Sequence, residues 1–159
     1  MKVLFKLMIF CLLLQGHVFA QDLMKERIWK IASRKKSIFL DKGIFHVTTT
    51  QSSGQVDGVR NSYIKSRGYE RVVFDFNTNM IPSLYGHISK AGNRIYIDFF
   101  NTKLSTTITA LKNTKYVQNL DFFAIDENSL SIELTMKEKN SFDIFYLDNP
   151  GRLVIDIKK

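Results

Sequence analysis

Apolar and polar residues alternate along most of the chain from residue 59 to the C-terminus. Between positions 70 and 77, for example, Val72, Phe74 and Phe76 occupy every second position. A period of two is typical of half-buried β-strands, whereas an amphipathic helix has a period near 3.6. The pattern predicts strands at 59–64, 70–77, 83–89, 94–99, 117–123, 129–136, 141–147 and 152–157.

The short segments between these strands contain turn-forming residues. Gly68 follows the first predicted strand, and Gly92 lies between the third and the fourth. Asn128 and Gly151 occupy the corresponding segments of the second half. Glycine and asparagine adopt the positive φ that tight turns require. We therefore expect the strands to be joined by tight turns.

The two halves of this β region resemble each other when the sequence is shifted by 58 positions. Residues 59–99 then align with 117–157 without a gap, and apolar positions keep their parity, as two copies of one β unit require. Sheets with one apolar face must pack against each other. We therefore predict an all-β sandwich of two pseudo-symmetric four-stranded sheets. Its predicted core includes Phe74, Phe76, Ile97, Ile132, Leu134 and Ile155.

The segments outside the repeat have other patterns. Residues 22–33 show apolar residues at helical spacing, and 37–40 with 44–47 reads as a hairpin around the turn 41–43. Residues 48–58 are rich in Thr, Ser, Gln and Gly, which is typical of a loop. The link 100–116 is compatible with a short helix or with a strand.

The first residues have the composition of an export signal. Lys2 and Lys6 precede a short apolar run, and Val18-Phe19-Ala20 forms an acceptable cleavage site. The apolar run is shorter than the roughly 20 residues that span a bilayer, although an uncleaved anchor is the alternative. We predict a signal peptide at 1–20, an N-terminal region at 21–57 and a β-sandwich domain at 58–159.

Composition and charge limit the compartment and the partners that can be expected for this protein. The chain has 159 residues, a formal charge of +8 and one cysteine, Cys11, which lies in the signal peptide. The mature chain would have no cysteine, which favours a bacterial periplasmic protein without disulfides or Cys-based metal sites. An exported basic protein rarely meets nucleic acid. Anionic cell-wall polymer or anionic lipid headgroups are better partners, and a merely solvated basic surface is the alternative.

Alternation also indicates which polar residues point outward. Outward residues of the first half, proposed to bind ligand on one sheet, are Arg71, Asp75, Tyr85, His87, Arg94, Tyr96 and Asp98. A possible second face on the other sheet contains Phe145, Arg152 and Asp156. Aromatic rings stack on sugars, and arginine forks suit the carboxylates of cell-wall peptides. The alternative is a ladder of cross-strand ion pairs that only stabilises the sheet.

Two segments resemble a known family. The strand Arg71-Val72-Val73-Phe74-Asp75-Phe76 resembles the R-V-V-x-D-hydrophobic strand of AMIN domains, and Asn149-Pro150-Gly151-Arg152 through Asp156 resembles that family's N-P-x-R…D element. The resemblance covers roughly 57–159. The second half departs from it, since Ser129–Glu133 replaces the Arg…Asp strand, and the chain carries no amidase or secretin domain.

The resemblance implies a bacterial cell-envelope β-sandwich that binds peptidoglycan. An alternative is an adaptor between proteins of a secretin- or pilus-type envelope assembly, using a sheet edge or the Phe145 face. We expect no transmembrane segment in the mature chain.

No catalytic motif accompanies these residues. The sequence lacks a nucleophile elbow, a His-Glu-x-x-His motif and a Gly-rich phosphate loop. Asp75 and Asp98 could be considered as a glycosidase pair, but each has an arginine four residues away on its own strand face. We therefore predict a binding module without catalytic residues, metal or cofactor.

Overall fold

The computed structural model describes residues 34–38, 40–106 and 108–159. The chain divides into two units, Met1–Lys35 and Lys36–Lys159, and the second contains every strand described below. The predicted signal peptide at 1–20 and the predicted helix at 22–33 lie outside the described residues.

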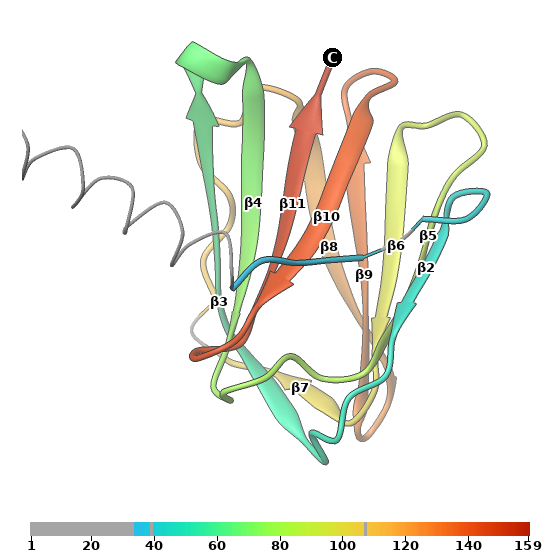
Figure 1. Ribbon diagram of the computed structural model, residues 1–159, viewed down its shortest axis with the longest axis vertical. Coiled ribbons are helices and arrows are strands. Elements are labelled where there is room, and N and C mark those ends of the chain that lie inside the picture. The colour runs from blue at the N-terminus through green and yellow to red at the C-terminus, as the bar shows by residue number, and fades with distance from the viewer. Residues whose placement is uncertain (1–33, 39, 107) are drawn as a thin grey trace, which may run out of the picture. The chain divides into compact units, whose positions relative to one another are not determined.

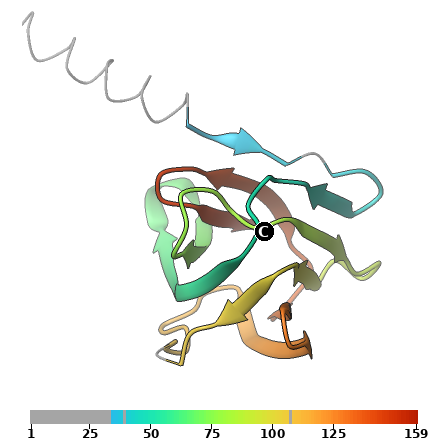
Figure 2. The ribbon, with the colours of Figure 1, turned by 90° about the horizontal axis from the view of Figure 1, so that it is seen from below.

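The described part of the chain is all-β (Figures 1 and 2). Its strands are β1 (Lys36–Ser37), β2 (Ile44–Val47), β3 (Gly54–Ile64), β4 (Tyr69–Phe76), β5 (Leu84–Ile88), β6 (Arg94–Phe99), β7 (Thr102–Leu104), β8 (Val117–Asp126), β9 (Ser129–Met136), β10 (Ser141–Leu147) and β11 (Arg152–Lys158), with a 3₁₀ turn η2 (Lys65–Arg67). The predicted strands of the repeat region match β3–β6 and β8–β11. The largest differences are at the start of β3 and at the end of β8, where the observed strands are longer than predicted.

The strands form two sheets within the described residues. Sheet 1 has the order β1-β10-β11-β4-β3-β7, and sheet 2 has the order β2-β5-β6-β9-β8. Their apolar faces share one core, in which Phe99 lies against Phe74 and Phe76. The predicted core residues are confirmed: Phe74, Phe76, Ile97, Ile132, Leu134 and Ile155 are each at most 4% exposed.

Each sheet combines one hairpin from each half of the chain. Sheet 1 contains β3–β4 and β10–β11, whereas sheet 2 contains β5–β6 and β8–β9. The links 77–83 and 137–140 therefore carry the chain from one sheet to the other. The order β10-β11-β4-β3 in sheet 1 corresponds to β5-β6-β9-β8 in sheet 2 when residues are matched at the 58-residue offset.

The predicted count of four strands per sheet was too low, because segments outside the repeat add β1, β2 and β7. The predicted hairpin of 37–40 and 44–47 was wrong: β1 pairs with β10 in sheet 1, and β2 pairs with β5 in sheet 2. The turn at 41–43 exists, with positive φ at Lys42 and Gly43. The link after β6 contains the parallel strand β7, and no helix is present in its described residues.

Phe45 shows why the β2 segment belongs to the sandwich. Its side chain is 1% exposed and lies over Gly86, where a Cβ atom would approach the Phe45 ring to 2.3 Å. The absence of a side chain at position 86 therefore makes room for the ring. The predicted domain boundary between 57 and 58 falls inside β3.

The predicted turn glycines meet two different structural requirements, a positive φ or space for a neighbouring backbone. Gly68 and Gly92 have φ of 67° and 68°, the positive values predicted for tight turns. At Gly151 the need is space, since a Cβ atom there would lie 2.6 Å from the carbonyl carbon of Met80. The preceding Asn149–Pro150 bond is cis, and Asn149 itself has φ of 55°.

A buried carboxylate fixes the link that leads into β8. Glu70 is fully buried, and its Oε2 accepts backbone N–H bonds from Lys115, Tyr116 and Val117 at 3.1, 2.6 and 3.1 Å. Its Oε1 accepts a bond from the Asn61 side chain. Glu70 is not among the residues predicted from the sequence. The available signal was its charge at an inward position, with the same parity as Val72.

Candidate functional site

The exchange of hairpins redistributes the predicted ligand-binding residues over two surfaces. We call the outer surface of sheet 1 face 1 and the outer surface of sheet 2 face 2. The prediction that the residues of the first half share one sheet was wrong, because β4 and β6 belong to different sheets. Face 1 contains Arg71, Asp75, Phe145, Arg152 and Asp156, whereas face 2 contains Tyr85, His87, Arg94, Tyr96 and Asp98.

Face 1 is organised around a partly buried ion pair. Arg71 Nε and Nη2 donate to the two carboxylate oxygens of Asp156 at 2.6 and 2.7 Å. Asp156 is only 5% exposed, and hydrogen bonding to it raises the pKa of Arg71. The guanidinium carbon also lies 5.2 Å from the ring centre of Tyr69 and 5.4 Å from that of Phe145. Arg71 is therefore held within the fold by a two-point ion pair and by contacts with two aromatic rings.

A small apolar cluster completes face 1. Val73, Phe145 and Val154 lie side by side on β4, β10 and β11 and are 5%, 4% and 2% exposed. Leu147 packs against them. The expectation that Phe145 forms an exposed apolar face was therefore wrong, since outward-pointing neighbours with long side chains cover it. Nearby, Asp75 pairs with Arg60 at 2.7 Å.

Arg152 is the member of face 1 whose hydrogen bonding is incomplete. It stands opposite Asp75 in the sheet, and its Nε is buried without a hydrogen-bond partner within the described residues. The residue as a whole is half-buried. Among the predicted site residues, those on face 1 are less accessible than those on face 2.

Face 2 is more open and carries aromatic rings in adjacent rows. His87 on β5 and Tyr96 on β6 are cross-strand neighbours, with ring centres 4.7 Å apart and planes inclined by 18°. Tyr85 is 39% exposed and pairs with Asp98 on one side and with His46 of β2 on the other. Face 2 therefore holds a stacked His87–Tyr96 pair, with Tyr85 in the adjacent row beside the Asp98 carboxylate.

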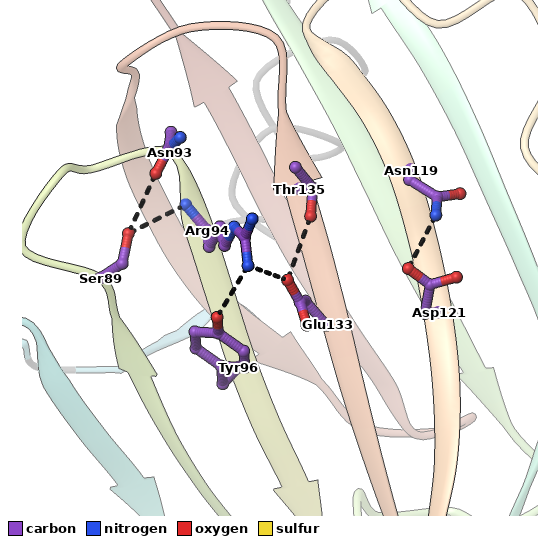
Figure 3. A network of polar contacts seen from close by, with 8 residues as sticks. All are labelled: Ser89, Asn93, Arg94, Tyr96, Asn119, Asp121, Glu133 and Thr135. Atoms are coloured by element: carbon purple, nitrogen blue, oxygen red, sulfur yellow. Dashed lines mark hydrogen bonds and ion pairs between the residues drawn. The ribbon is translucent and has the colours of Figure 1, made fainter.

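Polar contacts on face 2 surround Arg94 (Figure 3). Arg94 Nη1 lies 3.0 Å from Glu133 Oε1 and donates to the Tyr96 hydroxyl at 3.5 Å. The contact with Tyr96 and the charge of Glu133 raise the pKa of Arg94. The arginine side chain is 49% exposed, so its guanidinium retains free donor positions.

Two further features border these faces. Phe123 and Ile125 on β8, the edge strand of sheet 2, are 51% and 54% exposed. A pocket of about 630 Å³ lies at the end of the sandwich where β3 begins. Amide and hydroxyl groups dominate its lining, which includes Gln51, Gln55, Asn77, Thr78, Asn101 and Asn128.

The geometry argues against the glycosidase pair considered above. Asp75 belongs to face 1 and Asp98 to face 2, so the two carboxylates project from opposite surfaces and cannot flank one glycosidic bond. Within residues 34–38, 40–106 and 108–159, no group of three or more His, Cys, Asp or Glu side chains could hold a metal ion. In the same part of the chain, no helix has the length and apolar character needed to cross a bilayer.

A comparison with models of known protein families finds no match to this chain, and a comparison with curated proteins finds none either. The geometry of the two faces is therefore the basis for inferring function.

Proposed function

We propose that this protein is a non-catalytic, AMIN-like module of the bacterial cell envelope that binds peptidoglycan through face 2. The observation that carries the proposal is the aromatic surface of Tyr85, His87 and Tyr96, with Arg94 and Asp98 at its border. Sugar rings stack on flat aromatic groups, and planar donors and acceptors recognise their hydroxyl, amide and carboxylate substituents. Face 1 is a weaker candidate, because its arginine and aromatic side chains are engaged with each other.

Co-sedimentation of the mature protein with purified sacculi tests the proposal. The double variant Tyr85→Ala, Arg94→Ala should bind much more weakly, since truncation of one anchor residue commonly costs more than about 1 kcal/mol of binding. Tyr63→Ala is a matched control, because Tyr63 and Tyr85 are both 39% exposed and Tyr63 belongs to β3 of sheet 1. Equal binding by the double variant and the control would contradict the role of face 2.

Export to the periplasm is part of this proposal. The basic start, the apolar run and the Val18-Phe19-Ala20 tripeptide support cleavage after Ala20. Mass spectrometry of the periplasmic fraction should then find a chain that begins at Gln21. A chain beginning at Met1 in the membrane fraction would contradict cleavage.

We also propose that the two halves are copies of one β unit. The 58-residue alignment and the matching strand orders of the two sheets support this interpretation. Superposition of β3–β6 on β8–β11 should then require a rotation close to a half-turn. A rotation far from a half-turn would contradict the proposal that the two halves are copies of one unit.

A second candidate function is that of a protein adaptor that uses the β8 edge. Edge strands present unpaired backbone groups that can accept a strand of another protein. Phe123 and Ile125 would add apolar contacts there, and a groove of about 470 Å³ borders the first part of β8. Charge substitutions at these two positions would abolish such binding and leave sacculus binding unchanged.

A further inference from the structure

One end of the sandwich collects most of the positively charged links. The links β3–β4, β5–β6 and β9–β10 lie at the same end as the C-terminus (Figure 1). Strand pairing places them together, since Lys158 at the end of β11 pairs with Tyr69 at the start of β4, and Asn140 bonds to Gly92. We call this the basic end. It carries Lys65, Arg67, Lys90, Lys137, Lys139 and Lys158, all of them exposed.

Little negative charge offsets these side chains. The exposed carboxylates among the described residues of the basic end are Glu138, which pairs with Lys159, and Asp41, which adjoins Lys42. Glu70 lies nearby but is fully buried and holds backbone N–H groups. Within the described residues, Lys65, Lys90 and Lys139 form no ion pair. The ammonium groups of these three lysines are therefore available to an external anion, whereas Lys137 Nζ donates to the carbonyl oxygens of Thr114 and Lys115.

The opposite end has a different composition. Its links, 48–53, 77–83, 100–101, 127–128 and 148–151, contain no lysine or arginine. They contribute the carboxylates Glu127 and Asp148, of which Asp148 pairs with Lys36, together with the polar pocket described above, which Lys103 also lines. The sandwich therefore has a charge asymmetry along its strands, which would orient it in the field of a charged surface.

We propose that the basic end docks on the anionic lipid headgroups of a membrane surface, independently of face 2. The charged residues lie on separate links that belong to both sheets. Charges spread over an area in this way can contact a planar membrane surface together, whereas one polymer strand would reach only some of them. Lysine predominates over arginine, and lysine acts as a point charge without the fork that recognises individual phosphates. None of the pockets described is lined mainly by these lysines, as a site for one small anion would be.

This docking would set the orientation of face 2. With one end of the sandwich on the membrane, the strands would run away from the bilayer surface instead of along it. Both outer faces would then remain accessible at the sides of the sandwich. A protein held in this way could contact the membrane and the cell wall at the same time.

The experiment measures binding of the mature protein to phosphatidylcholine vesicles with and without phosphatidylglycerol. Binding should require phosphatidylglycerol and should fall as salt is raised. Each lysine near an anionic surface contributes about fivefold in affinity, so Lys65→Gln, Lys90→Gln, Lys139→Gln together should weaken binding about a hundredfold. Lys103→Gln is the matched control for Lys139→Gln, because Lys103 is exposed on β7, away from the basic end.

Three outcomes would overturn the proposal. One is equal binding to both kinds of vesicle, and another is unchanged vesicle binding by the triple variant. The third is tighter binding to soluble polyphosphate than to vesicles at equal phosphate concentration, which would assign the basic end to a polymer. A thermal melt verifies that each variant is folded. Sacculus binding by the triple variant should equal that of the wild type, which separates this proposal from the role of face 2.

Discussion

Face 1 and face 2 use similar residue types on the outer surfaces of two similar sheets, but they differ in accessibility. On face 1, Phe145 and Asp156 are 4% and 5% exposed, and Arg71 bridges them. On face 2, Phe123 is 51% exposed and the Arg94 side chain is 49% exposed. Alternation along a strand determines the direction of a side chain, whereas its neighbours on adjacent strands determine whether solvent reaches it.

The difference has an identifiable origin in cross-strand neighbours. Val73, Val154 and Phe145 form one continuous row on face 1, so apolar side chains cover each other and the neighbouring arginine closes over them. On face 2, the row through Phe123 continues to Ser131 and Asp98, which leaves the phenyl ring without apolar neighbours in its row. Face 1 is therefore expected to contribute to stability, and face 2 is available for binding.

Removal of the two phenyl rings tests this comparison with the largest expected effect. Phe145→Ala should lower the free energy of unfolding by about 3 kcal/mol or more, as for other buried phenylalanines. Phe123→Ala should change it by no more than about 0.5 kcal/mol, which is usual for exposed positions. Denaturant titration of both variants measures the two values. Similar losses in both would mean that the faces do not differ in this way.

Removal of the two arginines should give a smaller contrast. Arg71→Ala leaves the buried Asp156 carboxylate without its two charged donors, so the free energy of unfolding should fall by about 2–3 kcal/mol. Arg94→Ala should leave the thermal melt unchanged within error, because Glu133 remains partly accessible to water. Equal melting temperatures for the two variants would contradict this difference between the faces.

A conservative substitution refines the same comparison with the smallest effect. Arg71→Lys keeps the charge but loses the planar fork that holds both oxygens of Asp156, and we expect a loss of about 1 kcal/mol. Arg94→Lys should have no measurable effect on the melt. If Arg71→Lys were as stable as the wild type, charge alone would account for the pair.

The sequence was sufficient to predict strand positions and side-chain direction, because both depend on local alternation. Phe74 and Ile132, for example, are in the core as expected. It could not assign strands to sheets, since β4 pairs with β11 through contacts such as Arg71–Asp156, which are 85 residues apart. The assignment of strands to sheets determines which residues can form one site, because it places Arg71 on face 1 and Arg94 on face 2. The roles of Phe45 and Glu70 also depend on such distant contacts.

The exchange of hairpins between sheets makes the two halves of the chain interdependent. A fragment that ends in the link 105–116 would contain β3–β4 and β5–β6, but it would lack the strands that complete either sheet. Separate fragments should therefore remain largely unfolded and should assemble only when they are mixed. The intact sandwich should unfold in one cooperative transition. Its refolding should be slow for its size, because pairing between distant strands must precede most of the burial.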